Sequence, residues 1–522
     1  MAVARTRCIA LVGVTGHLVD VEADVGAGMA GLHLIGMLDT ALSEARDRVR
    51  SAVVNSRYGW PDARITVSLF PASLPKRGSV FDLAIAVALL AAAGAVPRDR
   101  VAALFFLGEL GLDGSVRAVR GVLPAVLAAA GAGARTVVVP ARNAAEAGLV
   151  PDVTVIPAAT LGELVSWLRS DDPVDVPMAE GAPTSEASGS GSWSPPPDDR
   201  GEAAPDLGDV AGQPFARRAL EVCAAGGHNL WMLGQPGTGK TMLAERLPTL
   251  LPPLRREEAL EVTAIHSVAG VLPADHPLLT RAPFVAPHHT TTVAAVIGGG
   301  SGAIRPGAVS LAHRGVLFLD EAPEYPATVL DSLRQPLESG RVTVSRALGS
   351  VTFPARFMLV LAANQCPCAR PSSPEDPCRC SPAVRRRYLA RLSGPLLDRI
   401  DVKVTLYRST RRELLADRRF IEPSRVVAER VLTAREHAAK RFAGRPWRCN
   451  AEMPTRALHA EYRPPPKAMS PLLRCLDSGE LSARGLDRVL RVAWTLADLA
   501  GKDGPDVGET NAALGLWLGE ER

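Results

Sequence analysis

The chain has 522 residues, of which 47% are hydrophobic and only 4% aromatic, so its cores must be built mainly from Ala, Val and Leu. This length suits roughly two to four domains, and a net charge of +4 is too small to indicate a nucleic-acid partner by itself. No apolar run reaches the roughly 20 residues that span a bilayer, and the N-terminus lacks a signal core with a cleavage site. We therefore expect a cytoplasmic protein without membrane contact, whose thiols stay reduced.

Residues 1–170 alternate short strand-like runs with helical ones. The β-branched runs Ile65–Leu69 and Thr136–Val139 predict strands, while Phe81–Ala93 and Leu123–Ala130 predict helices. The apolar, Ala-rich stretch around the first of these helices is typical of a buried helix. This pattern predicts an α/β or α+β domain.

A change in composition separates this domain from the rest of the chain. Residues 171–205 are rich in Pro, Gly, Ser, Asp and Glu and show no apolar periodicity, which predicts a flexible linker. Residues 206–408 then form a longer α/β region. Residues 409–522 are charged and helical, with the strongest helical pattern over residues 481–499.

Residues 234–241 match the pattern G-x-x-x-x-G-K-[ST] of a phosphate-binding P-loop. A predicted strand, Asn229–Leu233, precedes the loop, and a predicted helix, Thr241–Leu251, follows it, as the phosphate-binding geometry requires. Lys240 is expected at the β- and γ-phosphates of ATP and the Thr241 hydroxyl on Mg²⁺. The predicted cofactor-binding residues of the loop are Gly234, Gln235, Pro236, Gly237, Thr238, Gly239, Lys240 and Thr241.

Two further strands end in polar residues. The apolar run Val316–Leu319 ends in Asp320 and Glu321, which predicts a Mg²⁺-binding aspartate and a glutamate that polarises the attacking water. Without the P-loop, such acids would more simply cap a helix. The run Phe357–Ala363 ends in Asn364, where an amide can orient water against the γ-phosphate, although an isolated Asn at a strand end is usually a turn residue.

Four cysteines form two close pairs within residues 366–380. Two thiolate pairs facing each other across a Pro- and Ser-rich insertion suit a tetrahedral structural Zn²⁺, and free or redox-active thiols are the alternative. Arg385, Arg386 and Arg387 follow at once, and they either contact DNA or a neighbouring subunit or form a solvated charge run. The candidate zinc ligands are Cys366, Cys368, Cys378 and Cys380.

Two segments of the ATPase region are placed to meet a substrate. Residues 288–300 form an insertion that begins with His288 and His289, for which a structural role is favoured because no acidic or Cys partner lies nearby in sequence. Residues 338–354 alternate like a β-hairpin, with Arg341 and Arg346 toward its turn.

The runs RAPFVAPHHTTTVAAVIGGGSGAIRPGAVSLAHRGVLFLDEAPEY (281–325) and LSGPLLDRIDV (392–402) resemble the magnesium-chelatase-like AAA+ family, in its YifB/ComM branch. The resemblance extends over nearly the whole chain, including residues 16–53 and 482–499. It implies a homo-hexameric ring with ATP at subunit interfaces and a helical lid formed by residues 409–522.

The resemblance also implies roles for three polar residues. Arg399 matches the arginine finger, which stabilises the γ-phosphate of a neighbouring subunit; an intrachain pair with Asp398 or Asp401 is the alternative. Arg484 matches the sensor arginine of the lid. Asn364 matches the first sensor, although the run AANQCPC departs from the expected Met-Asn-Pro type.

Residues 1–170 resemble the Lon protease domain without its Ser-Lys dyad. The nucleophile position is occupied by Val80 and the lysine position by Leu123, while Ser79 and Lys76 are out of register. The resemblance thus indicates an interaction or assembly module with a protein partner, and not an active peptidase.

Together these features predict an ATP-hydrolysing ring motor. The ComM branch implies a DNA helicase that promotes branch migration in recombination and natural transformation, gripping single-stranded or branched DNA through arginines. The alternative is a magnesium-chelatase-like motor subunit or a protein-remodelling ATPase.

Overall fold

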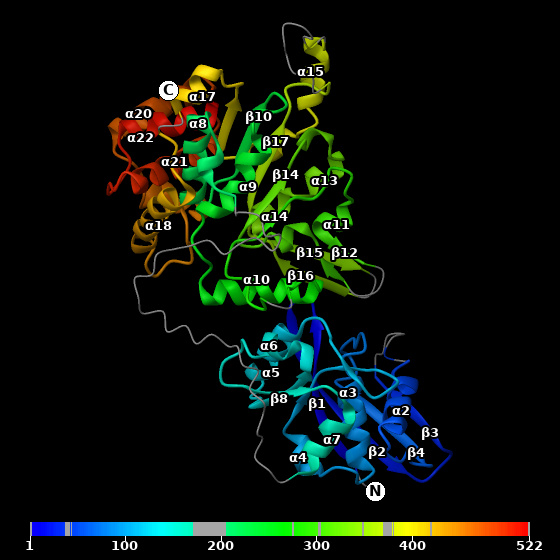
Figure 1. Cartoon of the computed structure of the whole chain (residues 1–522). Helices are drawn as coiled ribbons and strands as arrows, with labels where there is room; N and C mark the ends of the chain where they lie inside the picture. Colours follow the sequence, from blue (N-terminus) through cyan, green and yellow to red (C-terminus); the bar gives the residue numbers. More distant parts are fainter. Residues whose placement is uncertain are drawn as a thin grey trace.

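The structure is a computed structural model in which an N-terminal α/β body lies below a larger α/β body with C-terminal helices (Figure 1). It describes residues 3–36, 42, 44–170, 205–273, 276–300, 304–346, 349–368, 378, 380–417 and 420–519. The predicted linker lies outside these residues except for Pro205.

The N-terminal body contains one mixed seven-stranded sheet in the order β3-β4-β2-β1-β5-β8-β9. Strand β2 runs antiparallel to β1 and β4, and the other neighbours are parallel. The predicted strands at residues 65–69 and 136–139 are confirmed as β4 and β8. The strands are β1 Ala4–Val12, β2 Thr15–Gly26, β3 Gly31–Ile35, β4 Arg64–Phe70, β5 Phe105–Phe106, β8 Thr136–Pro140 and β9 Thr154–Ala158.

Helices α3 and α5 pack against β1 and β2 of this sheet. Every residue of α3 is buried, which explains its apolar sequence, because a helix that is surrounded on all sides needs no polar face. No helix in the described part of the chain is long and apolar enough to cross a membrane. The helices of this body are α2 Ala45–Asn55, α3 Asp82–Ala92, α4 Arg98–Ala102, α5 Val122–Gly131, α6 Ala144–Ala147 and α7 Leu161–Arg169.

The second body is built on a five-stranded, fully parallel sheet in the order β11-β14-β17-β10-β18. Strands β14 and β17 are buried along their whole length, as expected for continuous apolar runs in the middle of a parallel sheet. The predicted strands before the P-loop, before Asp320 and before Asn364 are therefore confirmed. The strands are β10 Leu230–Gly234, β11 Phe284–Val285, β14 Val316–Leu319, β17 Met358–Ala363 and β18 Val402–Leu406.

The helices of this body cover the sheet, and several of them lie in the segments that connect its strands (Figure 1). The predicted hairpin is confirmed as the antiparallel pair β15 Arg341–Arg346 and β16 Gly349–Pro354. Arg346 lies beside the turn, opposite Gly349, but Arg341 pairs with Pro354 at the open end, so its predicted place near the turn was wrong. The helices are α8 Pro214–Gly226, α9 Lys240–Leu250, α10 Arg256–Ala269, α11 Val293–Ile297, α12 Ala308–Leu311, α13 Ala327–Ser332, α14 Arg334–Ser339, α15 Pro382–Leu389 and α16 Gly394–Leu397.

The C-terminal region is helical, and its helix α21 confirms the helical pattern over residues 481–499. Helix α21 packs against α8, α18 and α22 and shares one hydrophobic core with the parallel sheet. The bidentate pair between Arg441 and the buried Asp498 joins α18 to α21. The helices are α17 Arg411–Asp417, α18 Ser424–Arg441, α19 Thr455–Ala460, α20 Pro466–Asp477, α21 Ala483–Leu499 and α22 Val507–Leu518.

Helix α10 of the second body docks onto the N-terminal body (Figure 1). Ala264 belongs to the N-terminal hydrophobic core, although it lies in the chain after the linker. The Ser267 hydroxyl donates a hydrogen bond to the Glu146 carboxylate. The backbone carbonyl of Ser267 accepts a hydrogen bond from the Gly121 N–H at 3.3 Å. The two bodies therefore share apolar and polar contacts through one helix.

A second contact joins the β1–β2 turn to the hairpin. Val12 and Val14 of the turn pack into the core that contains Val351 and Phe353 of β16. Gly13, with φ of +67°, permits this approach, because a Cβ there would lie 2.6 Å from the Val351 side chain. The hairpin of the ATPase region is thus in direct contact with the N-terminal body.

We expect Glu146→Ala to destabilise the junction. The buried carboxylate accepts hydrogen bonds from Leu123 N–H at 2.8 Å, from Asn143 Nδ2 at 3.2 Å and from Ser267. Its removal leaves these buried donors unpaired, so the free energy of unfolding should fall by about 1–3 kcal/mol in a denaturant titration. Glu163→Ala, at an exposed position of α7, serves as the control. Equal effects of both changes would contradict the assigned role of Glu146.

Candidate functional site

The predicted P-loop connects the buried strand β10 to helix α9. Gly237 and Gly239 have φ values of +75° and +91°, a region that residues with a side chain rarely adopt. The Thr238 hydroxyl donates to the Gln235 carbonyl at 2.8 Å and fixes the bend between them. Helix α9 begins at Lys240, so its N-terminus and free N–H groups meet the loop, as in an anion-binding site.

Lys240 lies at the centre of the site and is 7% exposed. Its Nζ donates to the Gly234 carbonyl, the Gln235 carbonyl and Asn364 Oδ1, each at 3.0 Å. Burial lowers the pKa of Lys240, while the nearby Asp320 and Glu321 carboxylates act in the opposite direction. The structure thus brings Asn364 to the P-loop.

Asp320 follows strand β14 and reaches the other end of the P-loop. Its Oδ2 accepts a hydrogen bond from Thr241 Oγ1 at 2.7 Å, and its Oδ1 accepts from the Glu321 N–H at 2.8 Å. A hydroxyl and a carboxylate in contact form the oxygen donor set that Mg²⁺ prefers. The predicted metal ligands therefore lie together.

Glu321 has a φ of +50°, a strained value for a residue other than Gly, Asn or Asp. Its carboxylate lies 3.4 Å from His289 Nδ1, and the His289 ring stands edge-on to Tyr325 at 6.5 Å between centroids. A structural role was predicted for His289 because no acidic partner is close in the chain. The sequence contained no signal for this contact, because it depends on the pairing of β11 with β14, which was not predicted.

Arg399 and Arg484 do not join this group within one chain. The Arg399 guanidinium is buried and donates to Glu338 and to the Pro395 carbonyl, so it has an intrachain ion pair, but with a partner other than Asp398 or Asp401. Arg484 is exposed in the first turn of α21, and no hydrogen bond or ion pair described here joins it to the P-loop.

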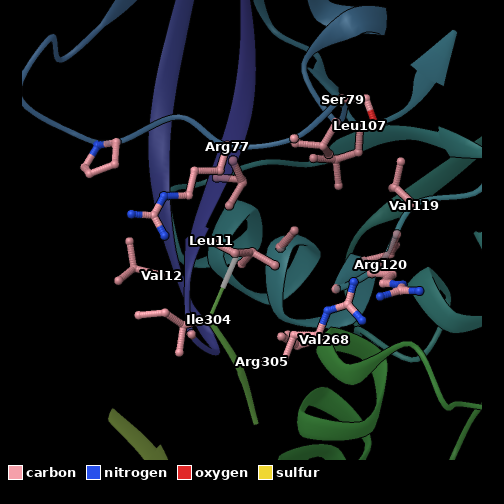
Figure 2. Close-up of a pocket in the computed structure, with 18 of the residues that line it drawn as sticks. Leu11, Val12, Arg77, Ser79, Leu107, Val119, Arg120, Val268, Ile304 and Arg305 are labelled. Atoms are coloured by element: carbon pink, nitrogen blue, oxygen red, sulfur yellow. The ribbon is translucent and has the colours of Figure 1, made fainter. Parts of the chain in front are cut away.

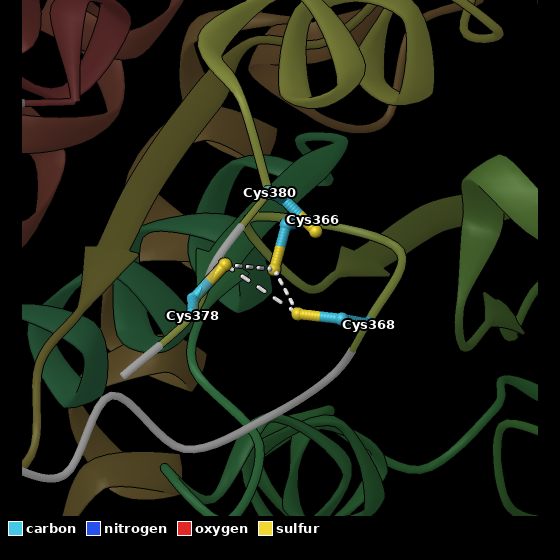
Figure 3. A group of neighbouring side chains, drawn as sticks. All are labelled: Cys366, Cys368, Cys378 and Cys380. Carbon is cyan, nitrogen blue, oxygen red and sulfur yellow. Dashed lines mark hydrogen bonds between the residues drawn. The ribbon is translucent and has the colours of Figure 1, made fainter. Parts of the chain in front are cut away.

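The four cysteines predicted to bind zinc lie close together in space (Figure 3). Their Sγ atoms all lie within 4.8 Å of one another, and Cys366 is 3.0 Å from Cys368 and 3.3 Å from Cys378. A tetrahedron of thiolates around Zn²⁺ requires S–S separations of about 3.8 Å. The donor set and arrangement fit that ion after an outward movement of several tenths of an ångström. Residues 369–377 and 379 of the predicted insertion lie outside the described residues.

The five arginines considered for DNA contact are all on the surface. Arg385, Arg386 and Arg387 are exposed on α15, and Arg341 and Arg346 are exposed on the β15–β16 hairpin. Within the described part of the chain none of them forms an ion pair with an acidic residue, so each guanidinium can meet a phosphate or solvent.

The positions of the Lon-type dyad carry no reactive groups. Leu123 is fully buried, and Val80 packs against the N-terminal core. The Ser79 hydroxyl donates to Glu109, while the buried Lys76 ammonium donates to the Pro71 carbonyl. Ser79 and Lys76 are therefore engaged with other partners than each other.

A parallel sheet with a P-loop, an Asp-Glu pair and a sensor-type Asn at its carboxyl edge defines an AAA+ ATPase. Residues 21–143 match the family described as "Subunit ChlI of Mg-chelatase". Residues 206–414 match "Magnesium chelatase, subunit ChlI", and residues 421–516 match "Magnesium chelatase, subunit ChlI C-terminal".

The similarity to individual proteins extends along the whole chain. An uncharacterized protein of Mycobacterium tuberculosis is 52% identical over 98% of each chain. Competence protein ComM of Haemophilus influenzae is 40% identical over 96% of this chain and 95% of its own. The chain belongs to the magnesium-chelatase-like AAA+ family, in its YifB/ComM branch. Lon protease of Geobacter metallireducens is 28% identical over 38% of this chain and 24% of its own, which supports a Lon-like N-terminal domain.

We expect Lys240→Ala to remove nucleotide binding. The variant loses the cation at the phosphates and leaves Asn364 and two loop carbonyls without their shared donor. Affinity for a fluorescent ATP analogue should fall at least about tenfold, equivalent to about 1.4 kcal/mol, and ATP hydrolysis should be lost. Lys467→Ala, on the exposed face of α20, should bind normally. Wild-type affinity in Lys240→Ala would contradict the assignment of the site.

Proposed function

We propose that the protein hydrolyses ATP at the P-loop with Mg²⁺ held by Thr241 and Asp320. The 2.7 Å contact between these two side chains carries the proposal. Bound Mg²⁺ would neutralise charge on the phosphates, as in other P-loop enzymes. Glu321 polarises the attacking water, and Asn364, fixed by Lys240, orients it.

The catalytic site is completed by a neighbouring subunit of a homo-hexameric ring. Arg399 supplies the arginine finger toward the nucleotide of the next subunit, and Arg484 acts as the sensor arginine of the helical lid. Support comes from their positions, since neither contacts the P-loop of its own chain among the contacts described. Glu338 holds Arg399 within the chain, and assembly exchanges this carboxylate for the γ-phosphate.

The ring acts on DNA as a helicase that promotes branch migration in recombination. The relative named Competence protein ComM and the exposed arginines of α15 and of the hairpin support this assignment. Arginines on protruding elements contact phosphates without reading the sequence, which suits a motor that moves along any DNA. A cytoplasmic location follows from this role.

The second candidate is a magnesium-chelatase-like motor subunit or a protein-remodelling ATPase. The three matches to ChlI descriptions favour it, because they name magnesium chelatase. In both cases the Lon-like domain acts as an assembly or partner-binding module and not as a peptidase, since Val80 and Leu123 occupy its dyad positions.

The cysteine cluster is proposed to hold one structural Zn²⁺. Strand β17 ends at Ala363, and Cys366 follows shortly after Asn364, so the ion would fix the start of the insertion at the carboxyl edge of the sheet.

DNA stimulation of ATP hydrolysis tests the motor assignment. We expect single-stranded or forked DNA to raise the rate of the wild type several-fold, with an effect that declines between about 50 and 200 mM salt. Lys240→Ala should show no hydrolysis, and Arg346→Ala should reduce stimulation, whereas Arg474→Ala, exposed on α20, should not. A rate indifferent to every DNA form would overturn the DNA assignment and favour the second candidate.

Zinc content tests the cysteine cluster. Wild-type protein purified from zinc-supplemented medium should contain about one Zn²⁺ per chain by elemental analysis, and Cys368→Ser should contain far less. Cys475→Ser, a cysteine on α20 outside the cluster, should retain the metal. If the wild-type protein contains no zinc, the proposed zinc site is wrong and the four thiols are free or redox-active.

A further inference from the structure

A cavity of about 500 Å³ lies at the junction between the Lon-like domain and the ATPase region (Figure 2). The N-terminal body contributes the end of β1, the loop 75–80 and residues 118–122. The ATPase region contributes Val268 of α10, Ile304, Arg305 and residues 349–351 of the hairpin strand β16. The volume lies in the range of small-ligand and peptide side-chain pockets.

The polar groups of the cavity carry excess positive charge. Arg77, Arg120 and Arg305 line it, and none of the three is described as pairing with a carboxylate of the chain. Glu109 is the one acidic residue among the described lining residues, and it already accepts a hydrogen bond from Ser79. Positive charges gathered in a recess with few negative groups favour the binding of an anion there.

The cavity arginines Arg120 and Arg305 come from different domains. In the view of Figure 2, Arg120 of the N-terminal body and Arg305 of the ATPase region lie at the same end of the cavity, and Arg77 lies at the other. Arg120 leans on the C-terminal end of α10, because its Nε would lie 2.4 Å from a Cβ added at Gly270. One carboxylate between Arg120 and Arg305 would therefore bridge the domain junction.

The walls of the cavity are aliphatic. Leu11, Val80, Leu107 and Val119 line the N-terminal side, and the described lining contains no aromatic ring. Single-stranded nucleic acids bind proteins largely by stacking bases on aromatic rings, so this lining is a poor nucleotide site. An aliphatic side chain, by contrast, gains free energy from burial against such walls.

We propose that this cavity binds a segment of a partner protein in which an aliphatic side chain stands next to a carboxylate. The aliphatic group fills the space between Leu11, Val80 and Leu107, and the carboxylate pairs with Arg120 and Arg305. The bound segment lies against the β15–β16 hairpin through Ser350 and Val351. The site is thus separate from the nucleotide site, and its occupant contacts both bodies.

Peptide binding tests the proposal on the full-length protein. The probe is a fluorescein-labelled hexapeptide with an acidic residue, a C-terminal leucine and a free carboxyl group, measured by fluorescence anisotropy at low salt. The wild type should bind it saturably, and Arg120→Ala and Arg305→Ala should each weaken binding at least about tenfold. Arg135→Ala, an exposed arginine outside the cavity, should bind as the wild type does.

A steric variant separates a pocket from simple charge attraction. Ala118→Trp fills the cavity from an exposed lining position and leaves all three arginines in place, so it should also abolish binding. All variants should hydrolyse ATP at the wild-type rate, which shows that they are folded. An amidated peptide with Gln in place of its acid should not bind.

Two results would overturn the proposal. One is peptide affinity that is unchanged in both arginine variants and in Ala118→Trp. The other is a single-stranded oligothymidylate that competes with the peptide and loses affinity in Arg120→Ala, which would assign the cavity to nucleic acid. Neither result affects the proposed ATPase, because Lys240 and Asp320 lie outside the cavity.

Discussion

The ammonium group of Lys240 is buried, and the surrounding site is arranged to satisfy it. A buried cation is costly unless its N–H groups find acceptors, and Lys240 finds them in two loop carbonyls and Asn364. This arrangement requires β10 and β17 to be parallel neighbours whose carboxyl ends lie at one edge. Strand β14 brings Asp320 to the same edge, so the order of the sheet determines which residues can meet the nucleotide.

Much of the site was predictable because its signals are local. The P-loop, the Asp320–Glu321 pair and Asn364 each follow an apolar strand directly, and carboxyl ends of parallel strands meet at one edge. The partners of Glu321 and Arg399 were not predictable in this way. His289 lies 32 positions before Glu321 and Glu338 lies 61 before Arg399, so only the packing of β11 and α14 brings them together. The sequence pattern of an exposed Glu such as Glu338 contains no information about its partner.

The same distinction applies to the fold. Strands and helices with clear periodicity, such as β8 and α21, lie where their patterns predict them. The docking of α10 was not predicted, because an amphipathic helix shows that it has an apolar face but not which core receives that face. Ala264 is buried in the N-terminal core, across a linker of more than thirty residues in sequence. The resemblance to Lon proteases describes the N-terminal body but not its contact with the ATPase region.

The docking of α10 attaches the N-terminal body to the ATPase region at a helix that precedes β11 in the chain. Strand β11 pairs with β14, and the segments that follow these two strands carry His289 and Glu321. The β1–β2 turn simultaneously packs on the hairpin that carries Arg341 and Arg346. A displacement of the N-terminal body would therefore act both on α10 and on the hairpin. Because packed cores move as units and resist continuous deformation, this double attachment favours joint movement of the two elements over independent movement of either.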